Sequence, residues 1–191
     1  FGYTNGVEWC ATEQVNVHSS RGLNWGAPMN LMDELGRLAR LLRDHPCFFD
    51  GARISRMDAP GSGVVALRRD SAEGLDSCLV LINADFDRAA TASIDAAGWA
   101  AMGRPTVDLA LVEPGPAAVE VVETDGRVEL RVGAGGVHCL AAGAAPRGVS
   151  GEDYRRMRAR ADWGLAALNA FDESPVMPGV GWRELAQRVD A

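Results

Sequence analysis

Two tryptophans and a glutamate near the start of the chain are residue types that could bind a sugar. Glu8, Trp9 and Trp25 lie within residues 1–29, which are rich in Gly, Asn, Ser and aromatic residues and show no sustained hydrophobic period. A long aperiodic stretch in a compact domain is typical of a functional loop. Aromatic faces stack on pyranose rings, and carboxylates bind hydroxyls. This mixture of side chains therefore suits a sugar site; the alternative is a loop that packs its tryptophans into a neighbouring domain. The residues concerned are Tyr3, Glu8, Trp9, Glu13, His18 and Trp25.

The same loop offers weaker support for catalysis. Retaining glycoside hydrolysis needs two carboxylates about 5–5.5 Å apart. Glu8 and Glu13 are the acidic pair in the loop, but nothing in the sequence fixes their separation. The motifs of phosphate-binding loops, dinucleotide sites, serine hydrolases and zinc proteases do not occur in the sequence. These four classes of site therefore have no support in the sequence.

Cysteine and histidine spacing gives no indication of a metal site. The sequence has three histidines and four widely spaced cysteines that form no C-x-x-C pair: Cys10, Cys47, Cys78 and Cys139. This spacing matches no common metal-ligand motif. We expect buried free thiols, no metal and no cofactor.

Charge and hydropathy narrow the possible partners. The formal net charge of −7 and the sequence pI near 5.0 argue against general nucleic-acid binding, which needs a positive surface. No stretch approaches the roughly 20 apolar residues of a membrane span, and no signal peptide is visible. We expect a reduced, cytoplasmic protein that binds neither nucleic acid nor membrane. The sequence starts at Phe1, inside what reads as a motif, so we expect a fragment of a longer protein.

An amphipathic helix follows the loop, over Asn30–His45. Its leucines form one stripe with the spacing i, i+4, i+7 and i+11: Leu31, Leu35, Leu38 and Leu42. Asn30 can cap the N-terminus, and Asp33 and Glu34 suit the positive end of the helix dipole. Pro46 lacks an N–H and disfavours helical geometry at His45, so the helix should end there.

The period changes to two after residue 51, which predicts short strands separated by turns. The predicted strands are 52–57, 63–69, 77–83, 88–94, 106–111, 118–123, 127–132 and 136–141. Asp125-Gly126 favours a tight hairpin turn, and a short helix is predicted over 96–102. Eight short strands at such spacing predict an antiparallel β-sandwich. Two helices should follow the linker, over 151–170 and 182–189, and the arginine-rich face of the first should be solvated.

The order of these parts resembles a known C-terminal arrangement. The segments GYTNGVEWC, NLMDELGRLARLLRDHPCF, GVVALRRD and SCLVLINAD are similar to the end of α-amylase-superfamily enzymes, glycoside hydrolase family 13. The pattern L-x-x-L-x-x-L-L-x-x-H-P, then V-x-A-L-x-R and L-V-L-I-N, resembles bacterial α-1,4-glucan maltosyltransferases most. The similarity covers about residues 1–142.

The resemblance implies a domain organisation and a role. Residues 1–46 would be the last strand, loop and helix of a (β/α)₈ barrel, residues 47–143 the β-sandwich after it, and 144–191 a linker and helical tail. The loop up to Trp25 would border the substrate cleft, with Glu8, Trp9 and Trp25 as candidate substrate-binding residues. The family's catalytic carboxylates would lie in the missing N-terminal barrel. This chain would then be a non-catalytic portion that buttresses the barrel of an enzyme acting on α-glucan or maltooligosaccharide. The alternatives are a carbohydrate-binding module and a helix-mediated interaction domain.

Overall fold

The computed structural model describes residues 6–12, 22–59, 61–111, 113–171 and 181–189. The chain divides into two compact units, Phe1–Arg40 and Leu41–Ala191, and the division falls within the first α-helix. The described elements, in chain order, are η1 (Val7–Trp9), α1 (Met32–Asp44), η2 (Pro46–Phe48), β1 (Arg53–Arg56), β2 (Val64–Asp70), β3 (Ser77–Asn83), β4 (Ala90–Asp95), α2 (Ala96–Ala101), β5 (Val107–Asp108), β6 (Gly115–Pro116), β7 (Glu120–Thr124), β8 (Arg127–Val132), β9 (Val137–Ala141), α3 (Glu152–Phe171) and α4 (Trp182–Arg188).

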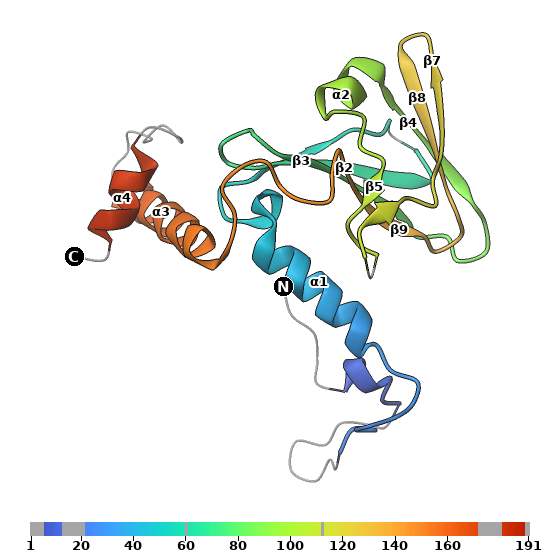
Figure 1. The fold of residues 1–191 in the computed structure, drawn as a ribbon, viewed down its shortest axis with the longest axis horizontal. Helices are drawn as coiled ribbons and strands as arrows, with labels where there is room; N and C mark the ends of the chain where they lie inside the picture. Colours follow the sequence, from blue (N-terminus) through green and yellow to red (C-terminus); the bar gives the residue numbers. More distant parts are fainter. Residues whose placement is uncertain (1–5, 13–21, 60, 112, 172–180, 190–191) are drawn as a thin grey trace. The chain divides into compact units, whose positions relative to one another are not determined.

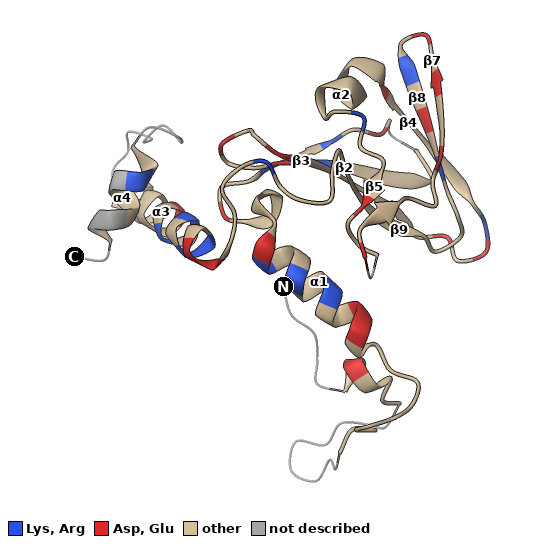
Figure 2. Ribbon diagram, in the orientation of Figure 1, with Lys and Arg blue, Asp and Glu red and all other residues tan. Residues whose placement is uncertain are grey.

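Helix α1 begins and ends where its sequence signals lie. The Asn30 side chain accepts a hydrogen bond from the Met32 N–H at 3.1 Å, which satisfies an amide that the helix itself leaves unpaired. Asp33 and Glu34 occupy the first turn, and the arginines follow further along the helix (Figure 2). His45 is extended, and Pro46 starts the separate turn η2. The predicted cap and the predicted stop at Pro46 are confirmed.

The strands form two antiparallel sheets (Figure 1). The larger has the order β1-β2-β3-β9-β5-β6, and the smaller has the order β4-β8-β7. The β7–β8 hairpin turns at Asp125-Gly126, with Thr124 paired to Arg127 and a φ of 81° at Gly126 that suits glycine. The expectation of a mainly antiparallel β-rich chain is confirmed.

One predicted strand is shorter than expected, and one strand was not predicted. The alternation over 106–111 predicted a strand of six residues, but β5 contains only Val107 and Asp108. The Asp108 carboxylate accepts the Ala110 N–H at 2.9 Å, and this local turn ends the strand. Strand β6 includes Pro116, which cannot donate to a ladder and is tolerated because β6 is an edge strand.

The two sheets share one hydrophobic core. Side chains of β2, β3 and β9 from the larger sheet pack with those of β4 and β8 from the smaller sheet, and α2 adds Trp99. In β8 every second residue is buried, as expected for a strand with one face on a core. The opposite face of the larger sheet carries a second cluster, built from Cys47, Cys78, Leu109, Cys139 and Ala141.

The two C-terminal helices pack on the segment that follows η2. Tyr154 of α3 lies between Phe49 and Trp182, with ring centroids 5.8 Å from each. Arg158 is buried; its Nε donates to the Asp50 carbonyl at 3.0 Å and its guanidinium lies 4.3 Å from the Trp182 ring centroid. The prediction of a fully solvated arginine face is therefore wrong at Arg158, because that side chain anchors the helix pair.

No helix within the described part of the chain combines the length and the apolar character needed to span a bilayer.

Candidate functional site

The sequence-predicted glutamate lies in η1, the short turn at the start of the described chain. Gly6 precedes this turn with a φ of 97°, and a Cβ there would approach Ala11 and Leu23 at 3.1 Å. The Gly6 N–H donates to Oε2 of Glu8 at 2.9 Å, and the Leu31 N–H donates to the Glu8 carbonyl at 2.8 Å. Glu8 is thus half-buried and braces its own loop, with carboxylate lone pairs still free to accept further hydrogen bonds.

The structure brings Trp9 and Trp25 together. Their ring centroids are 5.0 Å apart with the planes inclined by 45°, a favourable tilted geometry. The Asn24 side chain donates to the Trp9 carbonyl at 2.8 Å, which ties the two parts of the loop to each other. Trp25 is 77% exposed, whereas Trp9 is half-buried. The Trp9 ring therefore packs against the Trp25 ring, and the Trp25 ring is largely exposed to solvent.

Three further candidate residues of this loop have no described position. Glu13, the partner proposed for Glu8 as a catalytic pair, lies outside the described residues, as do Tyr3 and His18. The Trp9 indole N–H is buried and has no acceptor among the residues that the structure describes.

A second group of potential metal-binding side chains lies at the second hydrophobic cluster, on the face of the larger sheet opposite the main core. His45, Cys47 and Cys78 are all buried, and one ligand atom of each lies within 4.8 Å of the other two. The Cys78 sulfur is 3.8 Å from each ring nitrogen of His45. The Cys47 N–H donates to His45 Nδ1 at 3.3 Å. We call these three residues the His–Cys cluster.

Two elements build the His–Cys cluster: the turn η2, with His45 as its N-cap, and strand β3. Pro46 ends α1 and starts η2, so His45 and Cys47 lie on either side of one tight turn. Cys78 lies near the start of β3, on the face opposite Leu79. Cys139 lies close by on β9, which pairs directly with β3. The local His-Pro-Cys turn and the strand pairing therefore concentrate four soft or borderline donors in one buried region.

The pKa values of the Cys47 and Cys78 thiols are shifted in opposite directions. A hydrogen bond from Cys78 and the proximity of His45 lower the pKa of Cys47, although burial opposes this. Hydrogen bonds involving Cys139 and Cys47, together with burial, raise the pKa of Cys78. Of Cys47 and Cys78, Cys47 is therefore the thiol that more readily becomes a thiolate.

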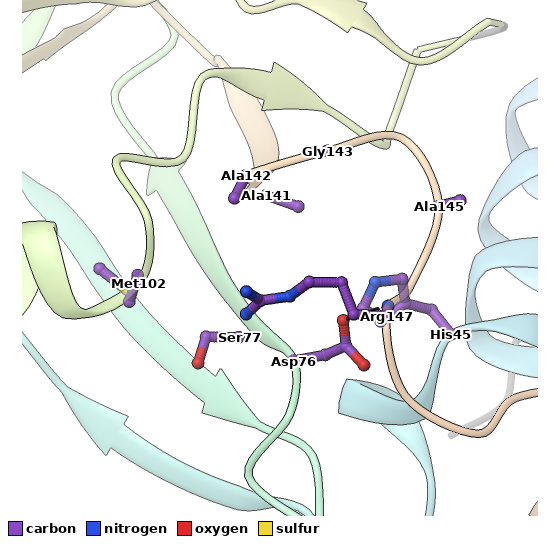
Figure 3. Close-up of a pocket in the computed structure, with 9 residues that line it drawn as sticks. All are labelled: His45, Asp76, Ser77, Met102, Ala141, Ala142, Gly143, Ala145 and Arg147. Carbon is purple, nitrogen blue, oxygen red and sulfur yellow. Dashed lines mark hydrogen bonds between the residues drawn. The ribbon is translucent and has the colours of Figure 1, made fainter.

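A small cavity adjoins His45. Its volume is about 130 Å³, and its walls include Asp76, Ser77, Met102 and Arg147. The Arg147 side chain extends across the cavity toward Ser77 and Met102 (Figure 3). The Asp76 carboxylate lies beside it and accepts the backbone N–H groups of Arg147 and Gly148 at 2.8 Å. The cavity is large enough for several water molecules.

Sequence reasoning missed the His–Cys cluster because its members are brought together by tertiary structure. Cys47 and Cys78 are 31 positions apart in the sequence, and no standard spacing of metal ligands links them. The one local signal is His45-Pro46-Cys47, where a proline-started turn places two donors near each other. The strand SCLVLIN, which carries Cys78, gives no sign of which segment its face will cover.

Comparison of the chain with protein-family models, with curated proteins and with solved structures finds no match.

Proposed function

We propose that this chain is the non-catalytic C-terminal portion of an α-glucan-active glycosidase or glycosyltransferase. In this proposal the two sheets and their shared core are the β-sandwich that buttresses the catalytic barrel. Helix α1 is the last helix of that barrel, and the loop with Trp9 and Trp25 lies at the rim of the substrate cleft. The order of loop, helix and two-sheet unit supports this assignment, as does the resemblance of the sequence motifs that form them.

The leucine stripe of α1 is the observation that carries the proposal. Leu31, Leu38 and Leu42 are 37%, 40% and 39% exposed. None of the thirteen residues of this helix is fully buried. A capped helix with an apolar stripe normally buries that stripe against a partner, since each leucine gains about 1.5–3 kcal/mol on full burial. Neighbouring barrel helices would supply that partner in the parent enzyme.

The paired tryptophans support a sugar ligand as the substrate class. Trp25 presents a large exposed ring that Trp9 supports from one side. Glu8 lies in the same turn as Trp9 and retains lone pairs for a hydroxyl. Stacking on one ring with a nearby carboxylate suits a glucose unit of an α-glucan. Catalysis would come from carboxylates of the parent barrel, outside this chain.

Measurement of product release from maltoheptaose tests the proposal. The isolated chain should release no shorter or longer oligosaccharide, whereas the polypeptide extended by its upstream coding sequence should. Turnover by the isolated chain, or inactivity of the extended polypeptide on α-glucans and on maltose 1-phosphate, would overturn the proposal.

A specific observation favours an interaction role for the helical tail as a second candidate. Trp163 of α3 is 66% exposed, and Phe171 at the end of that helix is also exposed. Such rings could dock a protein partner without any sugar. Removal of residues 144–191 distinguishes this role: an unchanged oligomeric state and an unchanged unfolding midpoint would argue against it.

A further inference from the structure

The His–Cys cluster has the composition of a site for a thiophilic metal ion. Two thiol sulfurs and one imidazole are the donors that Zn²⁺ prefers in proteins, and carboxylates dominate the sites of hard ions such as Mg²⁺. We propose that His45, Cys47 and Cys78 bind Zn²⁺, with a water molecule as its fourth ligand. The proposal is independent of the sugar-related function above.

The distances in the cluster are close to those of a bound site. With metal–sulfur bonds of about 2.3 Å and metal–nitrogen bonds of about 2.0–2.1 Å, neighbouring ligands of a tetrahedral site are about 3.5–3.8 Å apart. The Cys78 sulfur already lies 3.8 Å from each His45 nitrogen. Nδ1 accepts the Cys47 N–H at 3.3 Å, so coordination through Nδ1 replaces that hydrogen bond with a bond to the metal. The three ligand atoms lie within 4.8 Å of one another, so a movement of about 1 Å closes the set.

Charge and backbone geometry also favour the ion. Two thiolates and a neutral imidazole balance the charge of Zn²⁺, so the loaded site carries no net charge into the protein interior. The ligands are held from both sides: His45 and Cys47 by the proline-started turn η2, and Cys78 by its strand pairing with Arg69. Arg69 in turn donates from Nε to the Cys47 carbonyl at 2.8 Å, which fixes the turn over the strand.

The set of protein ligands has three members. His45 belongs both to the cluster and to the wall of the cavity, whereas Cys47 and Cys78 do not line the cavity. A water molecule would complete the tetrahedral shell, as in zinc sites with three protein ligands. Cys139 lies near Cys78 but is not within the same ligand-to-ligand distance as the three proposed ligands. We accordingly assign three protein ligands and treat Cys139 as a neighbour.

Cobalt titration of the full chain tests the site. Metal-stripped protein kept reduced with a phosphine should bind one Co²⁺ per chain, with a sulfur-to-cobalt charge-transfer band in the near ultraviolet and intense visible bands of tetrahedral Co²⁺. Added Zn²⁺ should abolish these bands and raise the thermal unfolding midpoint, since it binds the folded state preferentially, and Mg²⁺ should do neither. Cys47→Ser and Cys78→Ser should weaken Co²⁺ binding by more than about 100-fold.

Two variants serve as matched controls. Cys10→Ser removes a half-buried thiol at the end of η1, in the other compact unit, and Cys139→Ser removes the neighbouring thiol; both should keep the cobalt bands. A loss of the bands in Cys139→Ser would contradict the three-ligand set. If a ligand variant fails to fold, the native chain still decides: it should bind one Co²⁺, and one equivalent of Zn²⁺ should displace it. Native protein without the charge-transfer band would overturn the proposal.

Discussion

The Oδ2 atom of Asp108 lies 2.7 Å from Nδ1 of His138; the Asp108 side chain is buried, and that of His138 is partly buried. The other carboxylate oxygen of Asp108 accepts the N–H groups of Ala110 and Cys139 at 2.9 and 3.0 Å. One carboxylate therefore joins strand β5 to strand β9 through two hydrogen bonds, and a third ties it to the residue that ends its own strand. It compensates for the short ladder of β5, which has two residues.

Replacement of Asp108 by alanine should destabilise the two-sheet unit. The substitution leaves the buried Cys139 N–H without its acceptor, and we expect a loss of about 2–4 kcal/mol in the free energy of unfolding. Chemical denaturation monitored by tryptophan fluorescence measures it. Asp125→Asn, in the exposed β7–β8 turn, is the matched control and should change the free energy by less than about 0.5 kcal/mol. Equal effects of the two substitutions would contradict the role of Asp108.

The contribution of Asp58 to the free energy of unfolding should depend on pH. Its side chain is fully buried; burial acts to raise its pKa, but hydrogen bonds from Arg56 and from the Ala66 N–H outweigh this, and the pKa of Asp58 is lowered. A carboxyl with a lowered folded-state pKa stabilises the fold above its unfolded pKa of about 3.9, and that stability is lost as the pH falls through the folded-state pKa.

Asp58→Asn tests this dependence directly. At pH 7 we expect the variant to be less stable than the native chain by about 1–3 kcal/mol, because it loses a charged acceptor. The difference should shrink as the pH is lowered below about 3.9. Urea unfolding at several pH values measures it. A difference that stays constant from pH 7 to pH 3 would show that the charge of Asp58 contributes nothing.

Two leucines of α1 should respond differently to substitution. Leu41 packs against the cysteine-containing second cluster, so Leu41→Ala should lower the free energy of unfolding by about 1–3 kcal/mol. Leu38 lies on the open stripe, and Leu38→Gln should change it by less than about 0.5 kcal/mol in the isolated chain. Denaturation of both variants provides the comparison. A large loss with Leu38→Gln would mean that the stripe is already covered within this chain.

Local signals in the sequence predicted much of the fold. Strands β3 and β8 have the predicted bounds, because each alternates cleanly and is flanked by turn residues. Helix α1 has the expected cap and stop, since Asn30 and Pro46 act on their immediate neighbours. Such features depend on a few adjacent residues and so are visible without a tertiary structure.

Features set by tertiary contacts were not predicted. Strand β6 exists because the Pro116 segment lies against Val107, not because of its own propensity. The burial of Arg158 depends on the Asp50 carbonyl, which is 108 positions away. Of the candidate sites, Trp9 and Trp25 could be selected by residue type, although their stacking could not. The His–Cys cluster depends on which strand face covers the turn after α1.

Calorimetric titration with maltoheptaose tests most directly the claim that this chain is part of an α-glucan site. The native chain should bind the sugar, and Trp25→Ala should weaken binding by about 1–3 kcal/mol, the order of one lost aromatic contact. Trp163→Ala removes a ring of similar exposure from α3 and should leave the affinity unchanged. Absence of binding at millimolar maltoheptaose, or equal weakening by the two substitutions, would contradict the account.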